Sequence, residues 1–192
     1  DSSGYTTQRL RIRDILNRPY TSPWQRGLSI KNPYWGCVNN PEFRILFLNA
    51  GVNLAKLKPY ALFVDDAIFN ARLKKEQLGG CFCHYCLNQF SASVEEQEKV
   101  RVATLAFFKK GDIDDDQKEL ISSYETFQFQ SVLNFLVDWK EQILFLYPDL
   151  LFLTNNYNGL WNELYQVFDG GIAELDRAFI NSSSLDSLYG VA

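Results

Sequence analysis

The residues in this chain whose types and spacing point most directly to chemistry are its cysteines. There are four, one isolated and three within six residues: Cys37, Cys81, Cys83 and Cys86. Three such close thiolates fit poorly into disulfides, whose geometry is narrow. A tight turn can instead aim all three at one ion, and a distant fourth completes a tetrahedron. The pattern predicts a closed, structural zinc site, with two disulfides or inert buried thiols as the alternatives.

The single histidine restricts the catalytic chemistry that the chain can carry. His84 lies between two of the clustered cysteines, and we expect it to be a solvated spectator, although a histidine is able to replace a cysteine as a ligand. Ser-His-Asp and Cys-His sites both require a histidine. Carboxylates are therefore the remaining acid–base groups.

Acidic residues follow two short apolar runs. Asp65 and Asp66 come directly after Tyr60–Val64, and Glu174 lies near the end of Gly170–Leu175. Ligand sites in parallel α/β folds lie at the carboxyl ends of strands. Two carboxyls there can flank a glycosidic bond, one protonating the leaving oxygen while the other attacks the anomeric carbon or activates water. The alternatives are a loop or capping acid for the first pair and an exposed or ion-paired acid for Glu174.

The elements that must position these residues alternate between strand and helix. The strand candidates are 27–30, 60–64, 150–153 and 170–175. The helix candidates are 11–16, a segment from Pro41 that ends before Pro59, one starting near Tyr85, 115–147, 161–168 and 184–189. The run 60–64 is continuously apolar, which suits a strand buried on both faces. Asp114, Asp115 and Asp116 are expected in a first helical turn, where they complement the helix dipole.

This alternation predicts an α/β fold with parallel strands. The length of 192 residues favours a single domain, with residues 1–26 as an irregular N-terminal segment. Eight strand–helix units close a barrel of about 250 residues, and the chain shows about half of them. We expect a (β/α) barrel of TIM type, incomplete within this chain, with the cysteine knuckle after a central strand. A small open sheet is the alternative.

Composition limits the partners. Hydrophobic residues make up 46% and charged residues 22%, which is typical of a folded domain. The net charge of −4 argues against a nucleic-acid partner, because such proteins present a basic face. No apolar run approaches the roughly 20 residues of a membrane helix. The sequence leaves a homo-oligomer open, and it favours a secreted or periplasmic location over a cytoplasmic one without fixing either.

Several motifs together resemble one enzyme family. They are Asn32–Cys37, Asn39–Pro41, Val64–Asp66, and Gly80–Cys86 with Phe90. In this order they resemble the central part of (β/α)₈-barrel glycoside hydrolases, especially the family 42 β-galactosidase-like group, whose corresponding cysteines bind zinc. Residues 150–175 resemble two later barrel strands of that group. The family carries Asn-Glu where this chain has Asp65-Asp66, so the resemblance implies Asp66 as the acid/base and Asp65 in place of the asparagine.

Two functions follow as expectations. The first is a glycoside hydrolase-like protein acting on O-glycosidic bonds of a poly- or oligosaccharide, with Asp66 and Glu174 as the carboxylate pair. The second is a non-catalytic carbohydrate-binding or scaffold protein that retains the barrel frame and the zinc. A zinc-ribbon interaction module is disfavoured, since such modules usually carry basic residues. The candidate sugar contacts are Tyr34, Trp35, Asn155, Asn156 and Tyr157, with core packing as the alternative for the first two.

Overall fold

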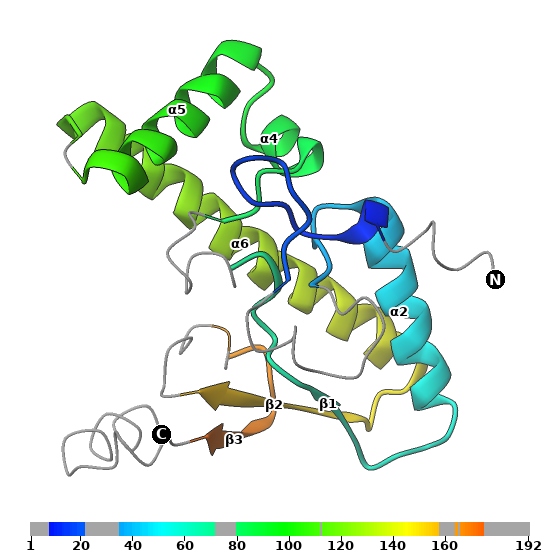
Figure 1. Cartoon of the computed structure of the whole chain (residues 1–192). Helices are drawn as coiled ribbons and strands as arrows, with labels where there is room; N and C mark the ends of the chain where they lie inside the picture. The colour runs from blue at the N-terminus through cyan, green and yellow to red at the C-terminus, as the bar shows by residue number, and fades with distance from the viewer. Residues whose placement is uncertain are drawn as a thin grey trace, which may run out of the picture. The chain divides into compact units, whose positions relative to one another are not determined.

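The computed structural model describes residues 8–21, 35–71, 80–111, 113–157, 164 and 166–174. Helices dominate, and they accompany one small sheet (Figure 1). In chain order the elements are α2 (Pro41–Ala55), β1 (Ala61–Val64), the 3₁₀ helix η2 (Phe69–Ala71), α4 (His84–Phe90), α5 (Val94–Lys110), α6 (Asp115–Leu146), β2 (Leu151–Tyr157) and β3 (Gly170–Glu174). They form two compact units. The first takes in the described residues within 1–45 and 69–132, and the second those within 46–68 and 133–192.

The described part of the chain contains no (β/α) barrel, so that prediction is wrong. It has a three-stranded sheet in the order β1-β2-β3. Both strand pairs are parallel, as expected from the alternation of strands and helices. The connection from β1 to β2 carries α4, α5 and α6 rather than one crossover helix. Among the strands that the structure describes, β1, which precedes the cysteine knuckle, lies at the edge of the sheet and not at its centre.

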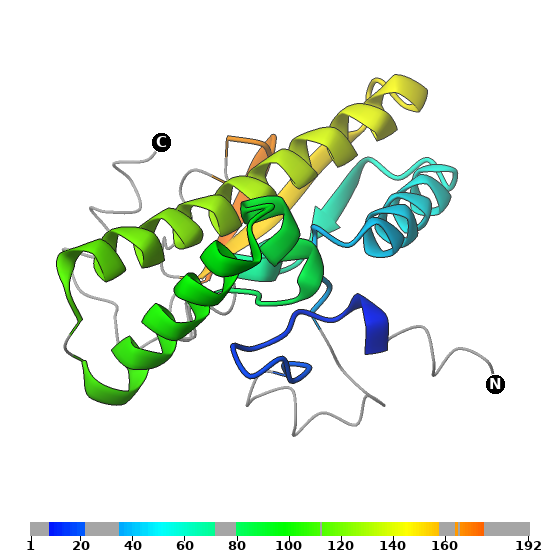
Figure 2. The same cartoon turned by 90° about the horizontal axis from the view of Figure 1, so that it is seen from above.

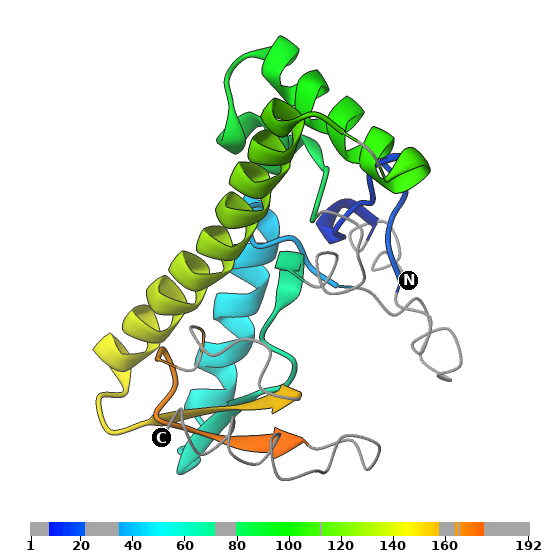
Figure 3. The same cartoon turned by 90° about the vertical axis from the view of Figure 1, so that its left-hand side faces the viewer.

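In the second unit, aromatic side chains pack against one face of the sheet. Figure 3 shows β2 and β3 side by side and pointing the same way. Phe152 of β2 is fully buried and meets Trp139 of α6 edge-on, with ring centroids 5.2 Å apart. Phe47 of α2 packs on Trp139 in turn, at 5.1 Å. In β1, Leu62 is buried while Phe63 is 47% exposed. The expectation that this strand is buried on both faces is therefore wrong.

The core of the first unit is built around the knuckle and the helices that follow it. Phe82, next to the clustered cysteines, stacks on Tyr124 of α6 with centroids 4.9 Å apart, and both side chains are buried. Figure 2 shows α5 lying alongside the N-terminal part of α6. The expected helix near Tyr85 is in fact two helices. Ser93 separates them, because its side chain accepts a hydrogen bond from the backbone N–H of Glu96 and caps α5.

The long helix α6 begins and ends close to its predicted limits of 115 and 147. Asp114 accepts a hydrogen bond from the backbone N–H of Gln117 at 2.8 Å, and Asp115 and Asp116 lie in the first turn. The interpretation of these acids as helix-start residues is confirmed. Among the described residues, no helix combines the length and the apolar character that crossing a bilayer requires.

The N-terminal segment differs from its prediction. Residues 11–16 do not form a helix, because Arg11 and Arg13 make antiparallel bridges with Gly36 and Pro19. The Asp14 side chain holds the turn between Arg13 and Pro19 by accepting hydrogen bonds from the backbone N–H groups of Leu16 and Arg18. The predicted strand 27–30, helix 184–189 and most of helix 161–168 lie outside the described residues.

Candidate metal centre and strand-end carboxylates

The four cysteines come together in the first unit as predicted. Their sulfur atoms all lie within 4.8 Å of one another, and every one of the side chains is buried. The Sγ of Cys37 is 3.5 Å from those of Cys83 and Cys86, and all four cysteines are free. A disulfide requires about 2.05 Å, whereas sulfurs around a tetrahedral zinc, with bonds of about 2.3 Å, lie about 3.8 Å apart. The cluster is therefore compatible with a metal ion such as zinc.

The local backbone aims the sulfurs at a common point. Cys83 is the N-cap of α4, and its side chain makes no capping hydrogen bond. Cys86 lies in the first turn of that helix, and Cys81 precedes it. Gly80 makes the turn possible with a φ of 107°, and a Cβ at this position would lie 2.7 Å from the Gln128 side chain. Cys37 comes from the loop before α2, where its N–H donates to the Leu10 carbonyl at 2.8 Å.

Three N–H groups donate hydrogen bonds to the sulfurs. The amide nitrogens of Asn39 and Asn70 each lie 3.3 Å from the Sγ of Cys86. The backbone N–H of Arg13 lies 3.3 Å from the Sγ of Cys81. Such donors stabilise the negative charge of metal-bound thiolates and orient them. Sequence reasoning missed both asparagines as part of the site. Asn39 entered the sequence analysis only within the motif Asn39–Pro41. No sequence signal links Asn70 to Cys86 or Cys37, which lie 16 and 33 positions away.

Further hydrogen bonds fix the groups around the cluster. The side-chain oxygen of Asn70 accepts from the backbone N–H of Val38 at 2.9 Å. Gln128 of α6 accepts from the N–H of Cys81 at 3.4 Å and donates to its carbonyl at 3.2 Å. The hydroxyl of Tyr124 donates to the same carbonyl. Because these partners are themselves buried, the ligand loop has little freedom to rearrange.

Burial decides the electrostatics of the cluster. Removal from water raises the pKa of the Cys81 and Cys86 thiols, and Cys37 adds to this effect at both. Hydrogen bonds from the neighbouring thiols, Cys37 first, lower the pKa of Cys83. Burial also raises the pKa of Tyr124, helped by the nearby cysteine charges. All four cysteines can be thiolates together only when a cation compensates their charge. His84 is exposed, with its ring against Tyr85, and is not among the four clustered ligands.

The predicted carboxylates lie in the second unit, where one asparagine links two of them. Asp65 follows β1, and its carboxylate accepts a hydrogen bond from the Asn155 amide nitrogen at 2.7 Å. The amide oxygen of Asn155 accepts from the backbone N–H of Asp66 at 2.6 Å. The pairing of Val64 with Thr154 brings the end of β1 beside Asn155. Asp66 has a φ of 49°, in the left-handed region that few residues other than glycine adopt and that aspartate tolerates better than most.

The remaining predicted residues are placed in part. Glu174 lies in β3 opposite Tyr157, and Asn156 lies opposite Ala173, but the structure describes only the backbone at these positions. Tyr34 is outside the described residues. Trp35 is 8% exposed, which agrees with the core-packing alternative. The structure thus joins Asp65, Asp66 and Asn155 and leaves their separation from the Glu174 carboxyl undescribed.

Comparison of the chain with models of protein families, with curated proteins and with solved structures found no match.

Proposed function

We propose that this protein is a zinc-stabilised, glycoside hydrolase-like enzyme that cleaves O-glycosidic bonds at the carboxyl end of its parallel sheet. The observation that carries the proposal is the link from Asp65 through Asn155 to the backbone of Asp66, at the ends of two adjacent parallel strands. Polar groups at this edge are where parallel α/β proteins bind their ligands.

Zinc is the proposed metal because four thiolates with no open position are typical of structural zinc sites. Soft sulfur donors in a tetrahedral set also suit iron. The burial of all four sulfurs, and the local turn that carries three of them, favour a structural role over an electron-transfer one. The metal then stabilises the first unit and takes no part in the hydrolysis.

In the proposed reaction Asp66 is the acid/base and Glu174 the second carboxylate. Asn155 positions the acidic pair by holding the carboxylate of Asp65 and the backbone of Asp66 together. Asp65 is exposed, so its carboxylate is available to accept hydrogen bonds from sugar hydroxyls. Asn156 and Tyr157 are the proposed further sugar contacts, since they continue β2 beyond Asn155 toward its carboxyl end.

A hydrolysis screen tests this proposal. Purified chain is incubated with a panel of neutral and acidic oligosaccharides, and released reducing ends are measured. Asp66→Asn and Glu174→Gln should each lower turnover by about 100-fold or more, because each removes an acid–base or nucleophilic group. The matched control is Asp149→Asn, an exposed acid before β2, which should leave turnover unchanged. Full activity in Asp66→Asn would refute the assigned role.

A second candidate is a carbohydrate-binding protein without turnover. It is favoured by the hydrogen bond that Asn155 donates to the Asp65 carboxylate. This bond occupies part of the carboxylate and leaves less of it for proton transfer. In that case sugars bind saturably, Asn155→Ala weakens binding, and no reducing ends are released by the unmodified protein. Binding without release in the screen would select this candidate over the enzyme.

A further inference from the structure

A pocket of about 530 Å³ lies in the first unit beside the cysteine knuckle. Its size falls within the roughly 300–1,000 Å³ of small-molecule sites. Three arginines line it, Arg9, Arg13 and Arg101, and Glu42 is the one acidic residue among the lining residues that the structure describes. The chain as a whole has a net charge of −4, so this concentration of positive charge is local. We propose that the pocket binds a small molecule that carries carboxylate, phosphate or sulfate groups.

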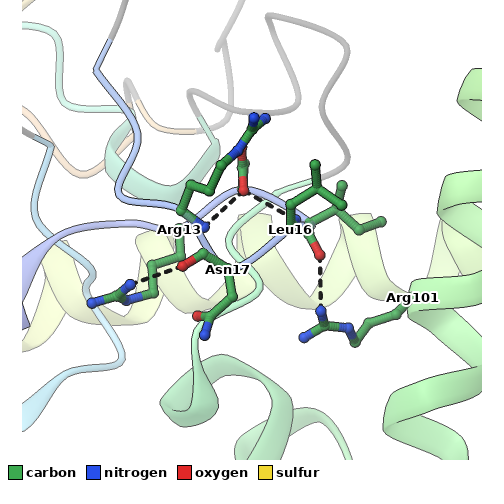
Figure 4. A network of polar contacts seen from close by, with 7 residues as sticks. Arg13, Leu16, Asn17 and Arg101 are labelled. Carbon is green, nitrogen blue, oxygen red and sulfur yellow. Dashed lines mark hydrogen bonds and ion pairs between the residues drawn. The ribbon is translucent and has the colours of Figure 1, made fainter.

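Backbone carbonyls hold two of the arginines in place. One terminal nitrogen of Arg13 donates to the Asn17 carbonyl at 2.8 Å, and the other to the Gln8 carbonyl at 3.4 Å. Arg101 of α5 donates to the Ile15 carbonyl at 3.0 Å (Figure 4). A carbonyl orients a guanidinium without neutralising its charge. The positive charges therefore stay available to an anion.

Acidic neighbours compensate this charge only weakly. Arg101 forms an ion pair with Glu98, in which the guanidinium nitrogen and the carboxylate oxygen are 3.8 Å apart. The Glu98 carboxylate is exposed to solvent. Arg9 is exposed and makes no ion pair with any residue that the structure describes. A guanidinium has five N–H donors in a fork that matches two oxygens of a carboxylate or phosphate. The described contacts of Arg13 and Arg101 use only some of these donors.

The arrangement of the lining residues also restricts the ligand. In Figure 4 the guanidinium groups of Arg13 and Arg101 lie on opposite sides of Asn17. Separate cations in the lining of one pocket favour a ligand with more than one anionic group. The rings of His84 and Tyr85, tilted by 38° with centroids 3.9 Å apart, give the wall an aromatic surface for the carbon frame of such a ligand.

Calorimetric titration of the metal-loaded chain tests the pocket. The probes are succinate, inorganic phosphate and inorganic sulfate at low ionic strength, with succinamide as the uncharged control. At least one anion should bind saturably, and succinamide should not. The tightest probe identifies the anionic group that the pocket prefers. If no anion binds the unmodified protein saturably, the proposal is refuted.

Variants separate this pocket from general charge attraction. Arg9→Gln and Arg101→Lys should each weaken the tightest probe about tenfold, because a charge-assisted hydrogen bond is lost. Arg101→Lys keeps the positive charge and removes only the forked donors of the guanidinium. Weaker binding in this variant therefore measures the contribution of the guanidinium geometry. Lys99→Gln, which removes a positive charge from an exposed site outside this pocket, should bind like the unmodified protein. Equal weakening in Lys99→Gln, or none in Arg9→Gln and Arg101→Lys, would overturn the assignment.

The test is independent of the proposed glycosidase. The pocket lies in the first unit and the strand-end carboxylates lie in the second. Anion binding without glycoside turnover would refute the proposed function and leave this pocket standing. Glycoside turnover without anion binding would refute the pocket and leave the proposed function standing.

Discussion

Asn70 donates a hydrogen bond to the Cys86 sulfur over 3.3 Å, and both side chains are fully buried. The same asparagine accepts from the backbone N–H of Val38, next to Cys37. One side chain therefore ties the isolated cysteine's loop to the knuckle. Asn70 belongs to the candidate metal centre together with the cysteines, because its hydrogen bond orients the Cys86 sulfur and would stabilise a negative charge on it.

We expect Asn70→Ala to lower metal affinity by about 10- to 100-fold, because outer-shell partners of metal ligands have effects of this size. Competition with a chromogenic chelator measures the affinity. Asn53→Ala is the control, since Asn53 is exposed on α2 and pairs only with Lys56 among its described contacts. Unchanged affinity in Asn70→Ala would show that the hydrogen bond to Cys86 does not support the metal.

The metal should be needed for folding of the first unit. We expect mass spectrometry to find one zinc per chain, and a strong chelator to lower the melting temperature by at least about 10 °C. Cys81→Ser should reproduce this loss in the presence of zinc. His84→Ala should not, because His84 is exposed and outside the cluster. An identical melting curve before and after chelation contradicts a structural metal.

Gly80 should tolerate substitution less well than Gly111. Both have positive φ, 107° and 68°. A Cβ at Gly80 would lie 2.7 Å from Gln128, whereas none of the atoms around Gly111 lies within 4 Å of such a Cβ. We expect Gly80→Ala to cost about 2–4 kcal/mol in unfolding free energy, and Gly111→Ala about 1 kcal/mol from backbone strain alone. Urea denaturation measures both, and equal costs would mean that Gln128 moves aside freely.

Asp169 should make the second unit sensitive to acid. Burial works to raise the pKa of this carboxyl, but hydrogen bonds from Lys140 and from the backbone N–H of Phe152, each at 2.8 Å, hold it below its ordinary value. A lowered folded-state pKa stabilises the fold above the unfolded value of about 3.9. This stability is lost as the pH falls through the folded pKa.

Unfolding free energy as a function of pH tests this expectation. Asp169→Asn should reduce stability at neutral pH and flatten its decline below about pH 4. Asp149→Asn, which alters an exposed acid in the turn before β2, should keep the slope of the unmodified protein. Parallel curves for Asp169→Asn and the unmodified protein would exclude Asp169 as the source of the acid sensitivity.

The sequence was sufficient where the signal is local. Cysteine spacing identified the four residues that cluster at metal-binding distance. The acidic start and apolar pattern of 115–147 identified α6, and apolar runs preceded by helices identified the parallel strands. The break between α4 and α5 was also readable, because Ser93 and Glu96 form the Ser-x-x-Glu spacing of a capping box. It was missed because a single helix was predicted from near Tyr85 and this spacing was not considered.

Features that depend on distant partners were beyond a single sequence. The barrel expectation was wrong because alternation of strands and helices does not determine how many strands a sheet contains. A helix at 11–16 was expected from composition, but Arg11 bridges Gly36 instead. The asparagines of the metal centre are ordinary polar residues until folding brings Asn70 against a sulfur 16 positions later in the chain.

The register of β1 against β2 has a consequence for synthesis of the chain on the ribosome. Ala61 pairs with Leu151, so β1 leaves the ribosome long before its partner is made. At about 5–20 residues per second, this interval is on the order of 5–20 seconds. The last cysteine ligand, Cys86, is made early in that time. All four cysteines of the candidate metal centre therefore exist in the nascent chain while the β1 edge is still unpaired.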